Sequence, residues 1–95
     1  MGSFDVAHIQ EQGVDLMIVP LASSFGSRPT TAQKERMAAL QGCARAAGLV
    51  GTVVAVWDAG GGRMGFLAPP QWHAFFRSID LPFVARNINR RLTCR

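Results

Sequence analysis

Short glycine-containing turns between apolar segments constrain the fold of this chain more than any other feature of its sequence. Residues 4–11 weakly alternate and residues 14–21 are rich in branched apolar side chains, with Gln12-Gly13 between them. Glycine accepts the positive φ that a two-residue hairpin turn requires, so this pattern predicts a β-hairpin. A second hairpin is predicted within residues 52–68, and a chain that combines two hairpins with helices belongs to the α+β class.

The second hairpin contains Gly60-x-Gly62-x-x-Gly65 in the stretch VWDAGGGRMGF, residues 56–66. In a dinucleotide-binding loop, glycines at this spacing turn a strand into a helix whose N-terminus faces a pyrophosphate. Here the third glycine is followed by a short apolar segment and Pro69-Pro70, and no acidic ribose ligand follows at the usual distance. We therefore interpret the glycines as a hairpin turn, and we expect no cofactor.

A helix is predicted directly after each hairpin. Thr30 and Gln33 have capping-box spacing and Gly48 is typical of a helix C-terminus, so the first helix should lie between them. The second helix should carry an apolar stripe at the i, i+3, i+4 and i+7 positions, formed by Trp72, Phe75, Phe76 and Ile79. We expect this aromatic stripe to lie in the core.

The last segment allows two interpretations. Val84, Ile88 and Leu92 share one face of a helix, but they also share one face of a strand. We favour a helix over residues 82–92, because proline suits the start of a helix and a strand would place arginines on the apolar face. The predicted order is β-β-α-β-β-α-α in a single domain of residues 1–95, with a strand as the alternative for the last element.

Positive charge is concentrated in the C-terminal part of the chain. The formal net charge is +4, and residues 59–95 carry six arginines against one carboxylate, Asp80. This bias suits an acidic small molecule or an acidic protein as partner, and it leaves nucleic acid as an alternative. The candidate nucleic-acid contacts are Arg86, Asn87, Arg90 and Arg91.

Other polar and aromatic residues are candidates for binding, although no catalytic constellation is visible and enzymatic activity stays open. The candidate ligand or partner contacts are Trp57, Arg63, Trp72, His73 and Arg77. Arg63 suits a carboxylate or phosphate, but Asp58 is available across the hairpin and we favour that internal pair. His73 and Arg77 are four residues apart and suit an anion, although we favour a solvated helix face.

The two cysteines and the apolar segments limit the cellular setting. Cys43 and Cys94 form neither a disulfide framework nor a zinc motif, so we expect two reduced thiols and no metal. Asp15 and Pro20 interrupt the most apolar early segment, and we expect no membrane span. The predicted location is the cytoplasm.

The stretch VWDAGGGRMGFLAPPQWHAFFRSIDLPFVARNINRRLTC, residues 56–94, resembles the C-terminal part of small uncharacterised proteins encoded by mobile integron gene cassettes. The resemblance implies a bacterial α+β protein that is often oligomeric, and it carries over no catalytic residue. Open strand edges and many large apolar side chains in a short chain also indicate a dimer or larger homo-oligomer. The predicted function is an interaction or ligand-binding module that acts as a homo-oligomer.

Overall fold

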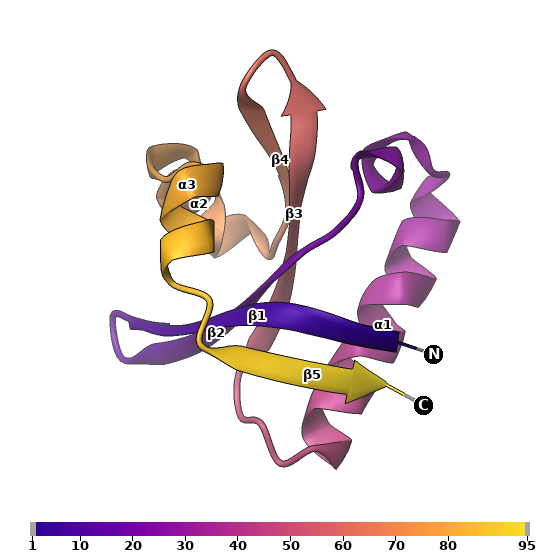
Figure 1. Cartoon of the computed structure of the whole chain (residues 1–95), viewed down its shortest axis with the longest axis vertical. Coiled ribbons are helices and arrows are strands. Elements are labelled where there is room, and N and C mark those ends of the chain that lie inside the picture. Colours follow the sequence, from indigo (N-terminus) through magenta and orange to yellow (C-terminus); the bar gives the residue numbers. More distant parts are fainter. Residues whose placement is uncertain (1, 95) are drawn as a thin grey trace.

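The computed structural model describes residues 2–94, which form one five-stranded sheet with helices on both faces (Figure 1). The strands are β1 (Gly2–Glu11), β2 (Val14–Pro20), β3 (Thr52–Gly60), β4 (Arg63–Leu67) and β5 (Arg90–Cys94). The helices are α1 (Thr30–Ala46), α2 (His73–Ser78) and α3 (Leu81–Arg86), with short 3-10 helices η1 (Ser23–Ser27) and η2 (Pro70–Trp72). This mixture confirms the predicted α+β class. None of the helices within residues 2–94 has the length and apolar composition needed to cross a membrane.

The strand order is β4-β3-β2-β1-β5, and only the pair β2–β3 is parallel. α1 makes the crossover between these two parallel strands, as parallel neighbours require. β1 pairs with β5 through residues 2–6 and with β2 through residues 7–11. Figure 1 shows β1 and β5 running across the direction of β3 and β4, so the sheet is strongly twisted.

Both predicted hairpins are present, and their turns have the backbone conformation that the glycines indicated. Gln12 and Gly13 have φ values of 52° and 78°, and both lie between β1 and β2. Gly60, Gly61 and Gly62 also have positive φ, at 96°, 61° and 78°. The glycine-rich loop is therefore a turn between antiparallel strands, with no helix following it.

Alternating strand side chains divide the core between the two faces of the sheet. On the face covered by α2 and α3, Ile18, Val54 and Val56 contact Trp72, Phe76 and Val84. On the face covered by α1, Met17, Val19 and Val53 contact Leu40, Ala44 and Leu92. Each face thus has its own apolar cluster, and the sheet separates them.

The aromatic stripe is only partly buried, and the predicted single helix is divided into η2 and α2. Trp72 and Phe76 are 7% and 1% exposed, whereas Phe75 and Ile79 are half-buried. The Phe75 ring makes edge contacts with Trp72, Phe76 and Phe83. The stripe is therefore a core element whose inner contact is made mainly by two of its four members.

α1 starts at Thr30 as predicted, but the predicted capping box is wrong. Pro29 occupies the N-cap position, which makes Thr30 the first helical residue and leaves no side-chain cap. The Gln33 amide instead donates to the Phe25 carbonyl at 3.0 Å and so ties α1 to η1. At the other end, Gly48 has a φ of 76°, as expected for a residue that follows a helix.

The prediction of one helix over residues 82–92 is wrong, and the predicted element order lacks the last strand. α3 ends at Arg86, and β5 begins at Arg90 and pairs antiparallel with β1. The objection to a strand fails because β5 is an edge strand: Leu92 is buried under α1, while Arg90 and Arg91 are exposed. An edge position leaves arginines in solvent without burying their charge.

Polar side chains fix the start of α3 and the path of the chain after its end. Asp80 caps its N-terminus by accepting from the Phe83 amide at 2.9 Å. Beyond the helix, the Asn89 carboxamide accepts from the His8 N–H at 2.8 Å and donates to the His8 carbonyl at 2.9 Å. Asn89 thus continues the β1–β5 ladder with its side chain and directs β5 along β1.

The expectation of two reduced thiols is wrong, because Cys43 of α1 and Cys94 of β5 form a disulfide. Their Cα atoms are 5.6 Å apart, although the residues are separated by 51 positions in the sequence. The pairing of β5 with β1 places the end of β5 against α1, as Figure 1 shows. Spacing in the sequence carries no sign of this approach, which depends on strand order.

Candidate functional site

A groove beside α1, called the α1 groove below, has a volume of about 930 Å³. One flank of α1 forms one wall, and the adjoining ends of β1 and β5 form the other. Four alanines contribute to the α1 wall, namely Ala32, Ala39 and Ala46 of α1 and Ala47 just after it. Phe4, Thr93 and Cys94 form the strand wall. The volume of the α1 groove lies within the range of about 300–1,000 Å³ that is typical of binding pockets.

The charged side chains of the α1 groove are Arg28, Glu35 and Arg36. Within residues 2–94, none of the three lies within ion-pair distance of an opposite charge. The salt bridge there joins Arg91 to Asp5, and His8 Nε2 lies 3.6 Å from the Asp15 carboxylate. The first turn of α1 also contains no acidic residue that would offset the positive end of the helix dipole. The groove therefore has an excess of positive charge.

The strand wall of the α1 groove is held by contacts with α1 and β1. The disulfide joins Cys94 to α1, and the Cys43 sulfur lies 3.4 Å from the Thr93 carbonyl oxygen. On the opposite face of the β1–β5 ladder, the Arg91 guanidinium donates to the Asp5 carboxylate at 3.2 Å. The disulfide is thus the covalent link between the two walls.

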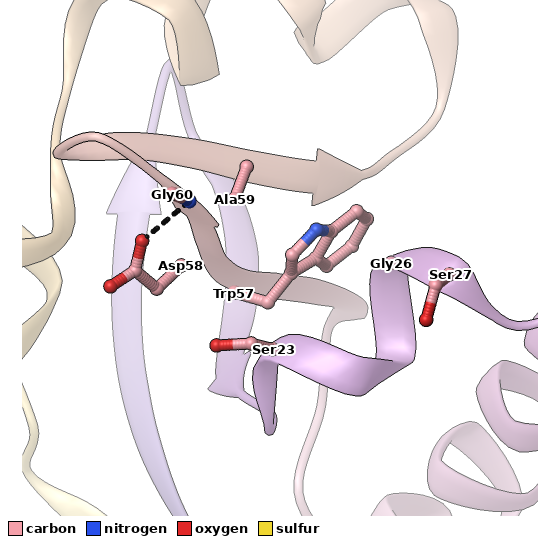
Figure 2. A pocket seen from close by; sticks show the side chains of 7 residues that line it. All are labelled: Ser23, Gly26, Ser27, Trp57, Asp58, Ala59 and Gly60. Carbon is pink, nitrogen blue, oxygen red and sulfur yellow. Dashed lines mark hydrogen bonds between the residues drawn. The ribbon is translucent and has the colours of Figure 1, made fainter.

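A smaller pocket of about 450 Å³ lies between η1 and the turn after β3 (Figure 2). Trp57 of β3 projects toward η1, and its indole packs edge-on against Phe25 with ring centroids 5.3 Å apart. A Cβ atom at Gly26 or at Gly65 would overlap this indole. The third glycine of the motif therefore makes room for Trp57, which attaches η1 to the sheet.

The glycine turn beside this pocket is poorly suited to a phosphate. The Asp58 carboxylate accepts from the Gly60 amide at 2.8 Å, as the dashed line in Figure 2 marks. Asp58 is the charged side chain of the pocket lining, and a carboxylate repels an anion. The predicted pair between Asp58 and Arg63 is wrong: no ion pair joins them in the described structure, where Arg63 is exposed at the start of β4.

The remaining ligand candidates do not converge with Trp57. Trp72 is buried in the core, and His73 packs its ring 5.4 Å from Phe66 on the face of the sheet covered by α2. His73 Nε2 lies within hydrogen-bond distance, 2.9 Å, of the Ala68 carbonyl oxygen, whereas Arg77 is exposed. The structure therefore distributes these residues over both faces of the sheet and forms no single site from them.

Two of the four tail candidates already make structural contacts. The Asn87 amide donates to the Phe83 carbonyl at 2.8 Å and so helps to end α3. Arg91 pairs with Asp5 across the β5–β1 ladder. Arg86 and Arg90 are exposed but lie on different elements, so the structure does not form the continuous polar helix face expected from the sequence.

Comparisons with protein-family models, curated proteins and solved structures find no match to this chain. Within residues 2–94, no three His, Cys, Asp or Glu side chains come together in an arrangement that could hold a metal ion. The geometry of the α1 groove is therefore the basis for a functional proposal.

The residues that give the α1 groove its charge were missed by sequence reasoning. Arg28 and Arg36 lie outside the basic C-terminal part on which the sequence-based interpretation concentrated. A usable signal is present, because these arginines flank the predicted start of a helix that contains many alanines. Only the position of β5 shows that a second wall faces them.

Proposed function

We propose that this protein is an interaction module that binds an acidic, extended segment of a partner protein in the α1 groove. The observation that carries the proposal is that Arg28 and Arg36 outnumber Glu35 among the charged side chains that line the α1 groove. Guanidinium groups bind carboxylates through charge-assisted hydrogen bonds, often in pairs. Between the longer side chains of the α1 wall, the alanines leave room for a peptide backbone to approach α1 closely.

The proposal can be tested by NMR titration of the ¹⁵N-labelled protein with an acetylated, amidated Val-Glu-Val-Glu-Val peptide. We expect saturable shifts of the α1 amides over residues 32–47, and at least about tenfold weaker binding when glutamine replaces both glutamates. Succinate provides a second arm, since binding as tight as that of the peptide would identify a small acid as the ligand. Absence of saturable shifts with the acidic peptide would overturn the proposal.

Matched arginine variants locate the charge contact. Arg36→Gln should weaken peptide binding at least about fivefold, because it removes a guanidinium from the groove. Arg77→Gln removes an exposed arginine of α2 that does not line the groove, and it should leave the affinity unchanged. Equal losses in the two variants would show that net charge, rather than the groove, attracts the peptide.

We also propose a homo-oligomer, supported by the open outer edges of β4 and β5 at the two ends of the described sheet. Uncovered apolar surface adds less support, since Val14 and Val50 are the large hydrophobic side chains that the described residues expose. Light scattering at micromolar concentration should give at least twice the chain mass of 10.3 kDa. A monomeric mass would contradict the proposed homo-oligomer.

Nucleic-acid binding stays an alternative, but the contacts of Asn87 and Arg91 do not favour it. A cytoplasmic location and the resemblance of residues 56–94 to proteins encoded by integron gene cassettes also stay predictions. The interaction module is preferred because a defined groove supports it.

A further inference from the structure

We propose that the Cys43–Cys94 disulfide is a redox latch that holds the strand wall of the α1 groove in place. Reduction would release the end of β5 from α1 and weaken binding in the groove. The release of β5 on reduction is inferred from the disulfide alone, whereas the effect of this release on binding rests on the proposed function. The latch would therefore regulate binding at the same groove.

The disulfide lies in the wall of a groove rather than within the core. Both cysteines are half-buried and both line the α1 groove, which opens to solvent. Thiol–disulfide exchange requires access of a thiolate to one of the two sulfurs. A buried structural disulfide in the core would lack this access.

The contacts of β5 indicate how far the release would extend. Leu92 is 1% exposed in the cluster beneath α1, and Asn89 anchors the start of the strand to His8. Beyond Leu92, Thr93 is exposed and Cys94 pairs with Gly2 at the end of the ladder. The bond to α1 thus reinforces the end of the strand that extends beyond the buried Leu92, and that end forms the groove wall.

The chemical step is a two-electron thiol–disulfide exchange. A thiolate of a dithiol reductant attacks one sulfur, which breaks the Cys43–Cys94 bond and forms a mixed disulfide. The second thiol of the reductant then displaces the remaining cysteine. The products are two protein thiols and the oxidised, cyclic disulfide of the reductant. A disulfide oxidant reverses the exchange, because it re-forms the Cys43–Cys94 bond and is itself reduced to thiols.

Hydrogen exchange of the complete chain, with and without dithiothreitol, tests the latch. We expect at least about tenfold faster exchange at the protected backbone amides among residues 2–4 and 93–94 on reduction, and unchanged exchange in β2 at residues 16–19. The Cys43→Ser/Cys94→Ser variant should exchange like the reduced protein and should not respond to dithiothreitol. Alkylation before reduction should label neither cysteine. Identical exchange of the oxidised and reduced proteins would overturn the latch.

The acidic peptide separates this proposal from the proposed function. Binding at least about threefold weaker to the reduced protein, with faster exchange at the end of β5, supports redox control of the groove. Equal binding to both forms overturns that control, even where exchange accelerates. Binding to neither form overturns the proposed function, while accelerated exchange still supports the latch on β5.

Discussion

Phe76→Ala should lower the free energy of unfolding by about 3–5 kcal/mol, the range found when a buried aromatic side chain is truncated. Phe76 is 1% exposed, and its ring centroid lies 5.6 Å from that of Phe66 and 5.1 Å from that of Phe75. Small domains have net stabilities of about 5–15 kcal/mol, so this loss is a large part of the total. Urea denaturation followed by circular dichroism should show a much lower midpoint.

Two neighbouring positions provide matched controls for this prediction. Arg77→Ala alters the next side chain, which is exposed, and should change the free energy of unfolding by less than about 1 kcal/mol. Phe75→Ala should destabilise less than Phe76→Ala, because Phe75 is only half-buried. A wild-type midpoint for Phe76→Ala, or a collapse caused by Arg77→Ala, would mean that α2 packs its other face on the sheet.

Removal of the disulfide should lower the free energy of unfolding by about 2–4 kcal/mol. The bond joins residues 51 positions apart, and in the chain-entropy account it restricts the unfolded chain over that whole loop. For a domain of this size, the loss corresponds to a decrease in Tm of about 10–20 °C. Calorimetry of oxidised wild type and of the Cys43→Ser/Cys94→Ser variant measures this difference.

A reductant separates the effect of losing the disulfide bond from the effect of replacing the cysteine side chains. Dithiothreitol should lower the Tm of the wild type toward that of the double variant, and it should leave the double variant unchanged. Cys43→Ser alone should be destabilised as much as the pair, because one substitution already abolishes the bond. A wild-type Tm that does not respond to reductant contradicts the assignment of a disulfide between α1 and β5.

The two predicted hairpins show where local sequence was sufficient. Gln12-Gly13 and the glycines at 60–62 adopt the positive φ values that tight turns demand, and the flanking segments pair as expected. Turn conformation depends on the steric limits of a few adjacent residues. A pattern of this kind needs no knowledge of distant contacts.

The helix starts and the tail show where local patterns were ambiguous. The capping box did not form, because Pro29 occupies the N-cap position of α1. The Gln33 side-chain amide donates to the Phe25 carbonyl of η1 instead. Residues 82–92 contain both a short helix and part of a strand, so neither periodicity held over the whole segment. Leu92 lies in a strand because residues 2–6 of β1 pair with β5, with Phe4 opposite Leu92.

By itself, the sequence determined the class of fold, the two hairpin turns, the extent of α1 to within its cap, and the apolar stripe that α2 packs on the sheet. Each of these depends on steric limits or side-chain periodicity over a few neighbouring residues. Only the tertiary structure decided the strand order, the Cys43–Cys94 bond, the slot that Gly26 and Gly65 leave for Trp57, and the groove that carries Arg28 and Arg36. These features join residues far apart in the chain, and they exist because β5 pairs with β1 and η1 packs on β3, contacts whose free energy is set by the packing of the whole domain.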